Sequence, residues 1–241
     1  MCIALPSFYK LYSNYNWLIP DTSKRCKPDD NACVKDIINY FIQAAVAGDP
    51  SKNINSLDPM SQEYVLGKFA VVNYTLHNST VTGFQKCYAV DTKLDLAKNS
   101  LRVNMFCPYL HMFGMYQING RLISVPIQGN GEYSLKCKEY HISFPTETKI
   151  FKGKDGNSYF QLKNLEVNAD LRGGMIINLT NLFKGKNKEM ADAALKFANE
   201  YWKPVSQEFQ GPIVIANVKK VIKNLNKYLK MVPLENLILL S

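Results

Sequence analysis

The chain has 241 residues, of which 46% are hydrophobic, and this composition excludes an intrinsically disordered protein because it suffices to bury a core. No run of about 18 apolar residues occurs, which excludes a transmembrane helix. The formal net charge of +9 admits nucleic acid or an anionic membrane as a partner. The densest basic residues repeat at helical spacing, which is typical of a solvated helix face, with anion or membrane contact as the alternative: Lys219, Lys220, Lys223, Lys227 and Lys230. Nucleic acid is not an expected partner, because basic and aromatic residues do not cluster on one element.

The six cysteines bear on the compartment. Cys26 and Cys33 are separated by six mostly polar residues and do not form the close pair of a zinc site. A small disulfide loop ahead of a helix fits this spacing, and so does a coincidence of two unrelated thiols. The loop is the favoured interpretation and implies an oxidising, extracellular setting. Cys87, Cys107 and Cys137 fall in strand-like sequence, and the pairing among them stays open.

The first predicted element is an amphipathic helix over Ala32–Ala47, where apolar residues recur every three or four positions. Asn31 is the expected N-cap, and Gly48 with Pro50 is expected to end the helix.

A long stretch with a period of two follows the helix and predicts an antiparallel meander. Its expected strands are Phe69–Leu76, Thr80–Lys93, Leu101–Tyr109, Gly114–Val125, Gly131–Phe144, Tyr159–Val167 and Gly174–Leu179. Short segments rich in turn-forming residues are expected to connect several of them: His77–Ser79, Leu96–Asn99, Gln128–Asn130 and Asp155–Asn157.

The last 55 or so residues show helical periodicity. The pattern runs from about Met190 to Leu229, and Pro204 and Pro212 inside it predict a kink or break. A helix of roughly 40 residues would span about 60 Å, and only an extended, curled sheet can bury an apolar stripe of that length. A sheet wrapped around such a helix leaves a gap along the axis, so the architecture predicts a container.

No constellation of catalytic residues is recognisable. His77, His111 and His141 are far apart and have no partner at metal-ligand spacing. The sequence also contains no nucleophile elbow and no phosphate-binding loop. We therefore expect no enzyme, no catalytic residue and no metal site.

Aromatic and methionine residues in or beside the strands are the candidates for the wall of an apolar cavity, because methionine adapts to flexible apolar partners. For any single one of them, a place in a packed core is the better interpretation. Tyr133 stands out, since a phenol can donate a hydrogen bond to a carbonyl, ester or epoxide. The candidates of these types are Met105, Phe113, Met115, Tyr133, Phe144 and Phe183, and the aliphatic Ile177 and Leu179 of the last strand complete the set.

Several segments, in order along nearly the whole chain, resemble the insect takeout and juvenile-hormone-binding protein family. They include the pair Cys26 and Cys33, which resembles the first disulfide of the family. The strongest match is Asn178–Phe183 followed by Asn199–Pro204. The other matching segments are Leu5–Lys10, Leu57–Met60, Gly114–Gly131 and Val232–Leu237.

The resemblance implies an α+β fold in which a strongly curved antiparallel sheet wraps one long C-terminal helix and encloses an elongated apolar tunnel. It implies a single domain over residues 1–241 that is secreted into haemolymph or a similar fluid. Its function would be to carry one elongated hydrophobic ligand, such as a juvenile-hormone-like terpenoid, a carotenoid, a quinone or a fatty compound. No cofactor is expected beyond that ligand, and we expect a monomer. An extracellular signalling protein, read by a receptor or membrane surface when loaded, is the alternative.

Further site residues are assigned on the basis of the fold that the resemblance implies. The first helix, with Phe41 and Ile42, is expected to cap one end of the tunnel. Phe197, Trp202 and Phe209 are expected to form the wall that faces the sheet. Two departures from the family pattern leave the ligand open: a longer, tyrosine-rich segment between Lys10 and Cys26, and the three further cysteines of the sheet.

Overall fold

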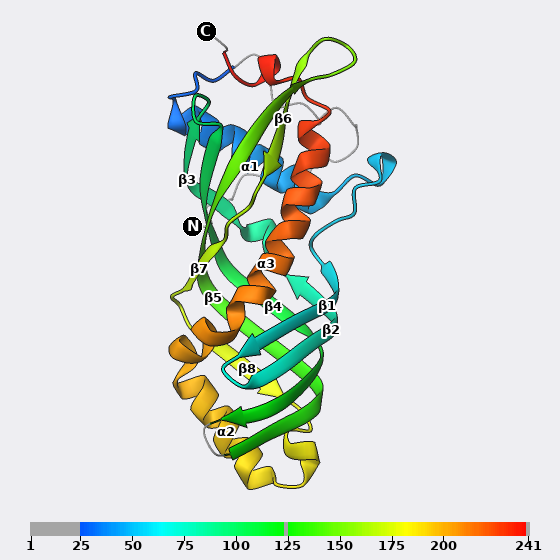
Figure 1. The fold of residues 1–241 in the computed structure, drawn as a ribbon, viewed down its shortest axis with the longest axis vertical. Coiled ribbons are helices and arrows are strands. Elements are labelled where there is room, and N and C mark those ends of the chain that lie inside the picture. The colour runs from blue at the N-terminus through cyan, green and yellow to red at the C-terminus, as the bar shows by residue number, and fades with distance from the viewer. Residues whose placement is uncertain (1–24, 123–124, 240–241) are drawn as a thin grey trace, which may run out of the picture.

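An eight-stranded antiparallel sheet and three helices make up residues 25–122 and 125–239, the part of the chain that the computed structural model describes (Figure 1). The helices are α1 (Asn31–Ala47), α2 (Lys188–Glu200) and α3 (Trp202–Leu229). The strands are β1 (Met60–Phe69), β2 (Val72–Thr82), β3 (Tyr88–Asp95), β4 (Ser100–Leu122), β5 (Val125–Lys152), β6 (Ser158–Lys163), β7 (Asn168–Leu171) and β8 (Met175–Leu179). The predicted α+β class, with a curled antiparallel sheet and a long C-terminal helix, is confirmed.

Two very long strands form the spine of the sheet. β4 and β5 pair from Ser100↔Glu147 to Leu122↔Val125. On one side β4 also pairs with β2 and β3, and on the other β5 pairs in turn with β6, β7 and β8. The sheet curves around α3, with α1 near one end of the molecule and α2 at the other (Figure 1). The side chains on the concave face and those of α3 therefore share one elongated core.

The predicted strand ends are wrong at three places. β4 runs without interruption through the expected break between Tyr109 and Gly114. Gln128–Asn130, expected as a turn, lies inside β5, where Gly129 pairs with Ile118. His77–Ser79 is a bulge inside β2, because the register against β4 shifts there and Asn78 adopts a left-handed φ of 50°. Glycine and asparagine in these strands thus mark bulges and close approaches as well as turns.

Two elements near the N-terminal side of the sheet were not predicted correctly. The single strand expected over Thr80–Lys93 is divided between β2 and β3 by a 3₁₀ turn at Phe84–Lys86. β1 was not expected, and it forms a hairpin with β2 through Ala70 and Val71, with Phe69 paired to Val72. The expected turns at Leu96–Asn99 and Asp155–Asn157 do connect consecutive strands.

The helix ends also differ in detail from expectation. The N-cap of α1 is Asp30, whose carboxylate accepts from the Cys33 amide at 3.0 Å, and not Asn31. The C-terminal helix breaks at Tyr201 and not at Pro204. Pro204 then falls in the first turn of α3, where a missing N–H costs no intrahelical hydrogen bond. At Pro212, where a kink or a break was expected, no break occurs, because α3 continues through it.

Three asparagines fasten the helices to strands of the sheet. Each one accepts a hydrogen bond from the N–H of a strand residue and donates one to the carbonyl of the same residue, at 2.6–3.1 Å. Because β3, β6 and β8 each pair with one strand only, these contacts satisfy backbone groups that no further strand reaches. The pairs are Asn39 with Ala89, Asn199 with Ile177, and Asn226 with Leu162.

Candidate functional site

Two cavities lie between the concave face of the sheet and the helices. Cavity 1, of about 50 Å³, is lined by β4, β5 and the first half of α3, among them Leu110, Cys137, Tyr140, Phe209 and Asn217. Cavity 2, of about 80 Å³, is lined by strands β3 to β6, α1, the end of α3 and the C-terminal segment, among them Phe41, Phe144, Phe160, Leu225 and Leu237. Pockets for small molecules usually measure roughly 300–1,000 Å³, so side chains must move before a long ligand can enter either cavity.

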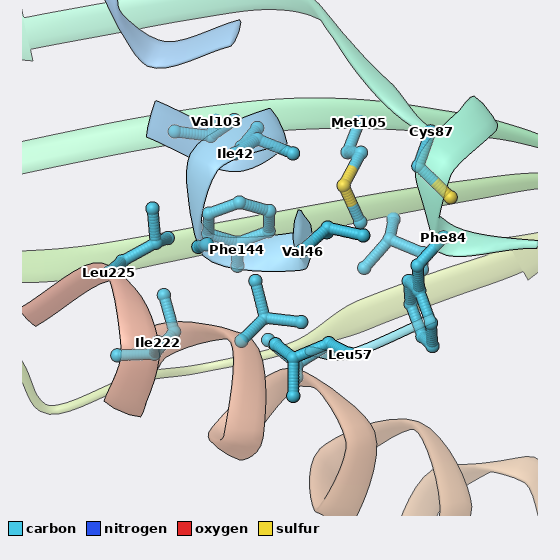
Figure 2. Close-up of a cluster of buried hydrophobic side chains, with 14 of the residues drawn as sticks. Ile42, Val46, Leu57, Phe84, Cys87, Val103, Met105, Phe144, Ile222 and Leu225 are labelled. Carbon is cyan, nitrogen blue, oxygen red and sulfur yellow. The ribbon is translucent and has the colours of Figure 1, made fainter. Parts of the chain in front are cut away.

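Buried side chains that line neither cavity, among them Met105 and Ile222, lie between the two sets of lining residues and form a wall (Figure 2). Along α3, Val218 lines cavity 1 and Leu225 lines cavity 2, and Ile222 lies between them. Figure 2 shows Met105 of β4 between two groups of side chains. Val103 and Phe144, on one side of it, line cavity 2, and Phe84, on the other side, lines cavity 1. Met105 is 3% exposed. The gap expected along the helix is therefore divided in two.

The two cavities differ in chemistry. The described residues that line cavity 2 all carry hydrocarbon side chains. Cavity 1 is mostly apolar, but Ser206, Gln210, Asn217 and Tyr140 also line it. Most of these polar groups are engaged: the Tyr140 hydroxyl donates to Gln210 Oε1, and Gln210 Nε2 donates to the Ala169 carbonyl at 3.2 Å. Cavity 1 is thus the compartment with hydrogen-bonding capacity.

The titratable groups of cavity 1 are neutral at physiological pH. Burial raises the pKa of the Cys137 thiol to about 12. Burial also raises the pKa of Tyr140 well above its usual range, with smaller contributions from Cys137 and Asp170. Since a low-dielectric environment disfavours the charged form of both groups, cavity 1 presents hydrogen-bonding groups without charge.

Comparison with known proteins identifies the family of this chain. The family model described as haemolymph juvenile hormone binding protein matches residues 4–239. The chain belongs to this family. The crystal structure of Epiphyas postvittana Takeout 1 matches with a TM-score of 0.83 and 29% sequence identity, over 90% of this chain and 99% of that one. The circadian clock-controlled protein daywake of Drosophila melanogaster is 26% identical over 208 residues, 80% of this chain and 78% of the relative, and the Drosophila yakuba protein matches to the same extent.

Five of the predicted ligand-binding residues lie at the cavities of this juvenile-hormone-binding family member. Phe41, Ile42 and Phe144 line cavity 2, and Phe209 lines cavity 1. Met105 lies in the wall between them.

Another three predicted residues border the main core without lining either cavity. Trp202 of α3 and Ile177 and Leu179 of β8 are half-buried and pack against it.

Phe113 and Met115 do not line the cavities, in contrast to the prediction. They are 38% and 36% exposed and lie with Asn78 and His111 along a depression on the outer face of the sheet. Their neighbours Met112 and Tyr116 point inward instead. The reason is that the inward-facing positions of β4 shift by one residue at Pro108.

Three more assignments are corrected. The Tyr133 hydroxyl donates to Ser79 Oγ of β2 at 2.7 Å in a buried position, so a hydrogen bond within the sheet uses the group that was expected to contact a ligand. Phe197 is 57% exposed and its ring packs on Tyr201, 4.7 Å between centroids, because α2 turns its small residues toward the sheet. Phe183 packs beside a small separate cluster made by Val72, Ile127 and Leu182.

Sequence reasoning missed several residues at the cavities, of which Phe84, Gln210 and Asn217 matter most. For Asn217 a signal existed: it is an amide inside the apolar stripe of the long helix, between Val214 and Val218. A polar residue at such a position points to a buried partner or a ligand. Phe84 follows Gly83 in a short 3₁₀ turn that periodicity does not reveal.

The disulfides are placed at the end of cavity 2 and near the wall. Cys26 pairs with Cys33, as the resemblance implied, and Cys87 pairs with Cys107, so Cys137 is the free thiol among the cysteines of residues 25–122 and 125–239. Backbone hydrogen bonds of 2.8 Å join Cys26 to Leu237 and Leu239, so the first disulfide holds the C-terminal segment over cavity 2. The resembling segment Leu5–Lys10 and the tyrosine-rich stretch after Lys10 lie outside the described residues.

Within residues 25–122 and 125–239, no group of three or more His, Cys, Asp or Glu side chains is arranged to hold a metal ion. The helices of the same ranges include none that is long and apolar enough to span a membrane.

Proposed function

We propose that the protein binds and carries one elongated, water-insoluble lipid in the space between the sheet and α3. The observation that carries this proposal is the succession of two apolar cavities along α3, together with membership of a family named for binding a hormone in haemolymph. The candidate cargoes share an elongated hydrocarbon skeleton: a terpenoid, a carotenoid, a quinone or a fatty compound.

The energetics of burial support such a role. A ligand with about 400 Å² of apolar surface gains roughly 10 kcal/mol on leaving water, at about 25 cal/mol per Å². The loss of ligand freedom offsets part of this gain, so dissociation constants from micromolar to nanomolar are expected. A carbon-lined cavity discriminates weakly between chains that differ by one methylene. Selectivity must therefore come from the length of the site and from its polar groups.

The wall at Met105 is expected to open when a long ligand binds. Methionine is unbranched and has three rotatable bonds, so it can leave its position at lower cost than a branched or aromatic side chain. Its displacement would join cavities 1 and 2 into one tunnel. A short ligand would fit one cavity and leave Met105 in place.

Two features favour an extracellular carrier. Two disulfides are formed within the described residues, and such bonds persist in oxidising compartments. The family description itself refers to haemolymph. We propose the same kind of fluid as the location of this protein, and a monomer as its working state.

We propose no enzymatic activity, since the family is one of binding proteins. The Tyr140 phenol and the Cys137 thiol of cavity 1 are held in their protonated forms and so are weak nucleophiles. Recovery of a bound juvenile-hormone-type ester unchanged after prolonged incubation supports a carrier, and its turnover by pure protein would contradict one.

The alternative function is signalling through contact with an anionic surface. Lys219, Lys223 and Lys230 are exposed along the outer face of α3, and no carboxylate of the described residues forms an ion pair with them. Ile215, which is 40% exposed, precedes them on the same face. Salt-sensitive binding of the loaded protein to vesicles containing anionic lipid would favour this function.

The decisive experiment is organic extraction of the protein purified from its native source, followed by absorption spectra and mass spectrometry. A stoichiometric lipid would establish the carrier and name the cargo. If nothing co-purifies and the protein takes up no lipophilic probe, the carrier function is wrong and the signalling function becomes the better explanation.

A further inference from the structure

A buried pair of amide side chains lies beside cavity 1. Gln62 of β1 and Asn217 of α3 are 4% and 8% exposed. Gln62 Nε2 donates to Asn217 Oδ1 at 2.9 Å, which uses the oxygen of the asparagine. Asn217 also lines cavity 1. A polar pair is thus placed between a strand and a helix whose other contacts are apolar.

The Asn217 amide nitrogen differs from those of the other asparagines on the inner side of the helices. Asn224 Nδ2 donates to the carbonyls of Ala45 and Asn55 at 3.0 and 2.9 Å. Asn199 and Asn226 donate to strand carbonyls. Asn217 Nδ2 makes no hydrogen bond to any described residue. Amide donors of side chains as buried as Asn217 are nearly always paired, and since Asn217 lines cavity 1, its nitrogen is available to a partner that enters the cavity.

We propose that Asn217 anchors the ligand by donating a hydrogen bond to one neutral acceptor oxygen, such as that of an ester, ketone, ether or epoxide. The inference rests on the proposed carrier function and refines its ligand class. A pure hydrocarbon would leave the amide unpaired in an apolar site, which is costly. A carboxylate would be an unpaired buried charge, because no Lys or Arg is among the described residues that line cavity 1.

The position of Asn217 also sets where the oxygen lies along the ligand. Asn217 and Val218 are the last residues of α3 that line cavity 1, and Ile222 of the wall follows about one turn later. The acceptor oxygen therefore lies in cavity 1 close to the wall. The longer hydrocarbon part extends past Met105 into cavity 2, whose described lining is entirely hydrocarbon.

The test compares three ligands of equal chain length: a methyl ester, the corresponding alkane and the corresponding carboxylate. Each displaces the fluorescent probe N-phenyl-1-naphthylamine from the full chain. The wild type is expected to bind the ester about five- to tenfold more tightly than the alkane, as one added buried hydrogen bond predicts, and the carboxylate most weakly.

Two variants separate the anchoring role from folding. Gln62→Leu with Asn217→Leu replaces both partners by apolar side chains of similar size, which leaves no buried amide without its partner. In this double variant the preference for the ester over the alkane is expected to disappear. Gln62→Leu alone is the matched control, because it retains the amide donor, and it should keep the preference.

An infrared measurement reports the bond itself. The stretching band of an isotopically labelled ester carbonyl should lie at lower frequency in the wild type and in Gln62→Leu than in the double variant. An ester preference and a carbonyl band that are the same in all three proteins would overturn the proposal while leaving the carrier function intact. A wild type that binds none of the three ligands and no probe would contradict the carrier function, and this anchoring role with it.

Discussion

Pro108 of β4 faces Glu139 of β5, and these two residues are left unpaired although the residues on either side of them pair in one register. Proline has no N–H to donate, and Glu139 adopts a left-handed φ of 53°. Its carbonyl accepts instead from the Arg172 amide at 3.1 Å. In β4 the inward-facing residues on the two sides of this point are Cys107 and Leu110, and in β5 they are Cys137 and Tyr140. In each strand two residues lie between the inward-facing ones, where a regular strand has one. The kink thereby changes which side chains of both strands reach the cavities.

Met105→Ala is expected to tighten the binding of long-chain ligands by about tenfold and to leave short ligands unaffected. Moving a well-packed side chain costs on the order of 1–3 kcal/mol, and the variant removes that cost only for ligands that cross the wall. Displacement of a fluorescent probe by esters of increasing chain length measures the effect.

Met112→Ala is the control, since Met112 lines cavity 1 away from the wall and loses the same atoms. Both variants should lose about 2–5 kcal/mol of stability. An identical dependence on chain length in Met105→Ala and the wild type would show that Met105 does not limit the site.

Removal of the first disulfide, by Cys26→Ser with Cys33→Ser, should lower the free energy of unfolding by about 2–3 kcal/mol. It should also accelerate ligand release, because the Cys26 backbone holds Leu237, which lines cavity 2. Stopped-flow release of a fluorescent lipid measures the rate. Cys87→Ser with Cys107→Ser, which loses a comparable amount of stability, should not open this end, and equal acceleration in both variants would refute the closing role.

Stability is expected to fall as the pH rises above about 8.5, the ordinary pKa of a thiol in an unfolded chain. Burial raises the pKa of Cys137 to about 12 in the folded protein. The folded state therefore retains a proton that the unfolded state has released, and the stabilisation present below pH 8.5 is lost toward pH 12, by up to about 1.4 kcal/mol per pH unit. Urea unfolding between about pH 8 and 10, where thiols but not yet most tyrosines titrate, measures the slope. Cys137→Val should flatten it, and an unchanged slope would contradict this assignment.

Gly83→Ala and Gly211→Ala are expected to have opposite effects. Gly83 has a φ of 108°, and a Cβ there would lie 2.3 Å from the Tyr109 carbonyl oxygen, so the variant should lose about 2–3 kcal/mol. Gly211 lies in α3, and its Cβ would meet no atom within 4 Å, so alanine should add about 0.5–1 kcal/mol. The thermal unfolding midpoints of the two variants test these expectations. Destabilisation by Gly211→Ala would show that this turn of α3 is not an ordinary helix.

The sequence by itself determined the class of fold and the kind of site. A period of two followed by a long helical stripe implied a curled sheet around a helix, because no other surface buries so long a stripe. The segments resembling takeout proteins located the family, and four residues predicted to bind a ligand line the cavities: Phe41, Ile42, Phe144 and Phe209. Local periodicity and composition suffice for such conclusions, since they depend on residues close in the chain.

The tertiary structure alone decided which side chains face inward beyond Pro108, where the helix breaks, and how the cavity is divided. The periodicity of one strand does not reveal that the inward-facing positions of two paired strands shift together by one residue. Phe113 and Met115 were therefore placed on the wrong face of the sheet. The wall at Met105 and the Gln62–Asn217 pair arise from contacts between distant segments; the two amides are 155 residues apart. Burial and hydrogen-bond partners at such distances are set by packing, which the pattern of one strand or helix does not specify.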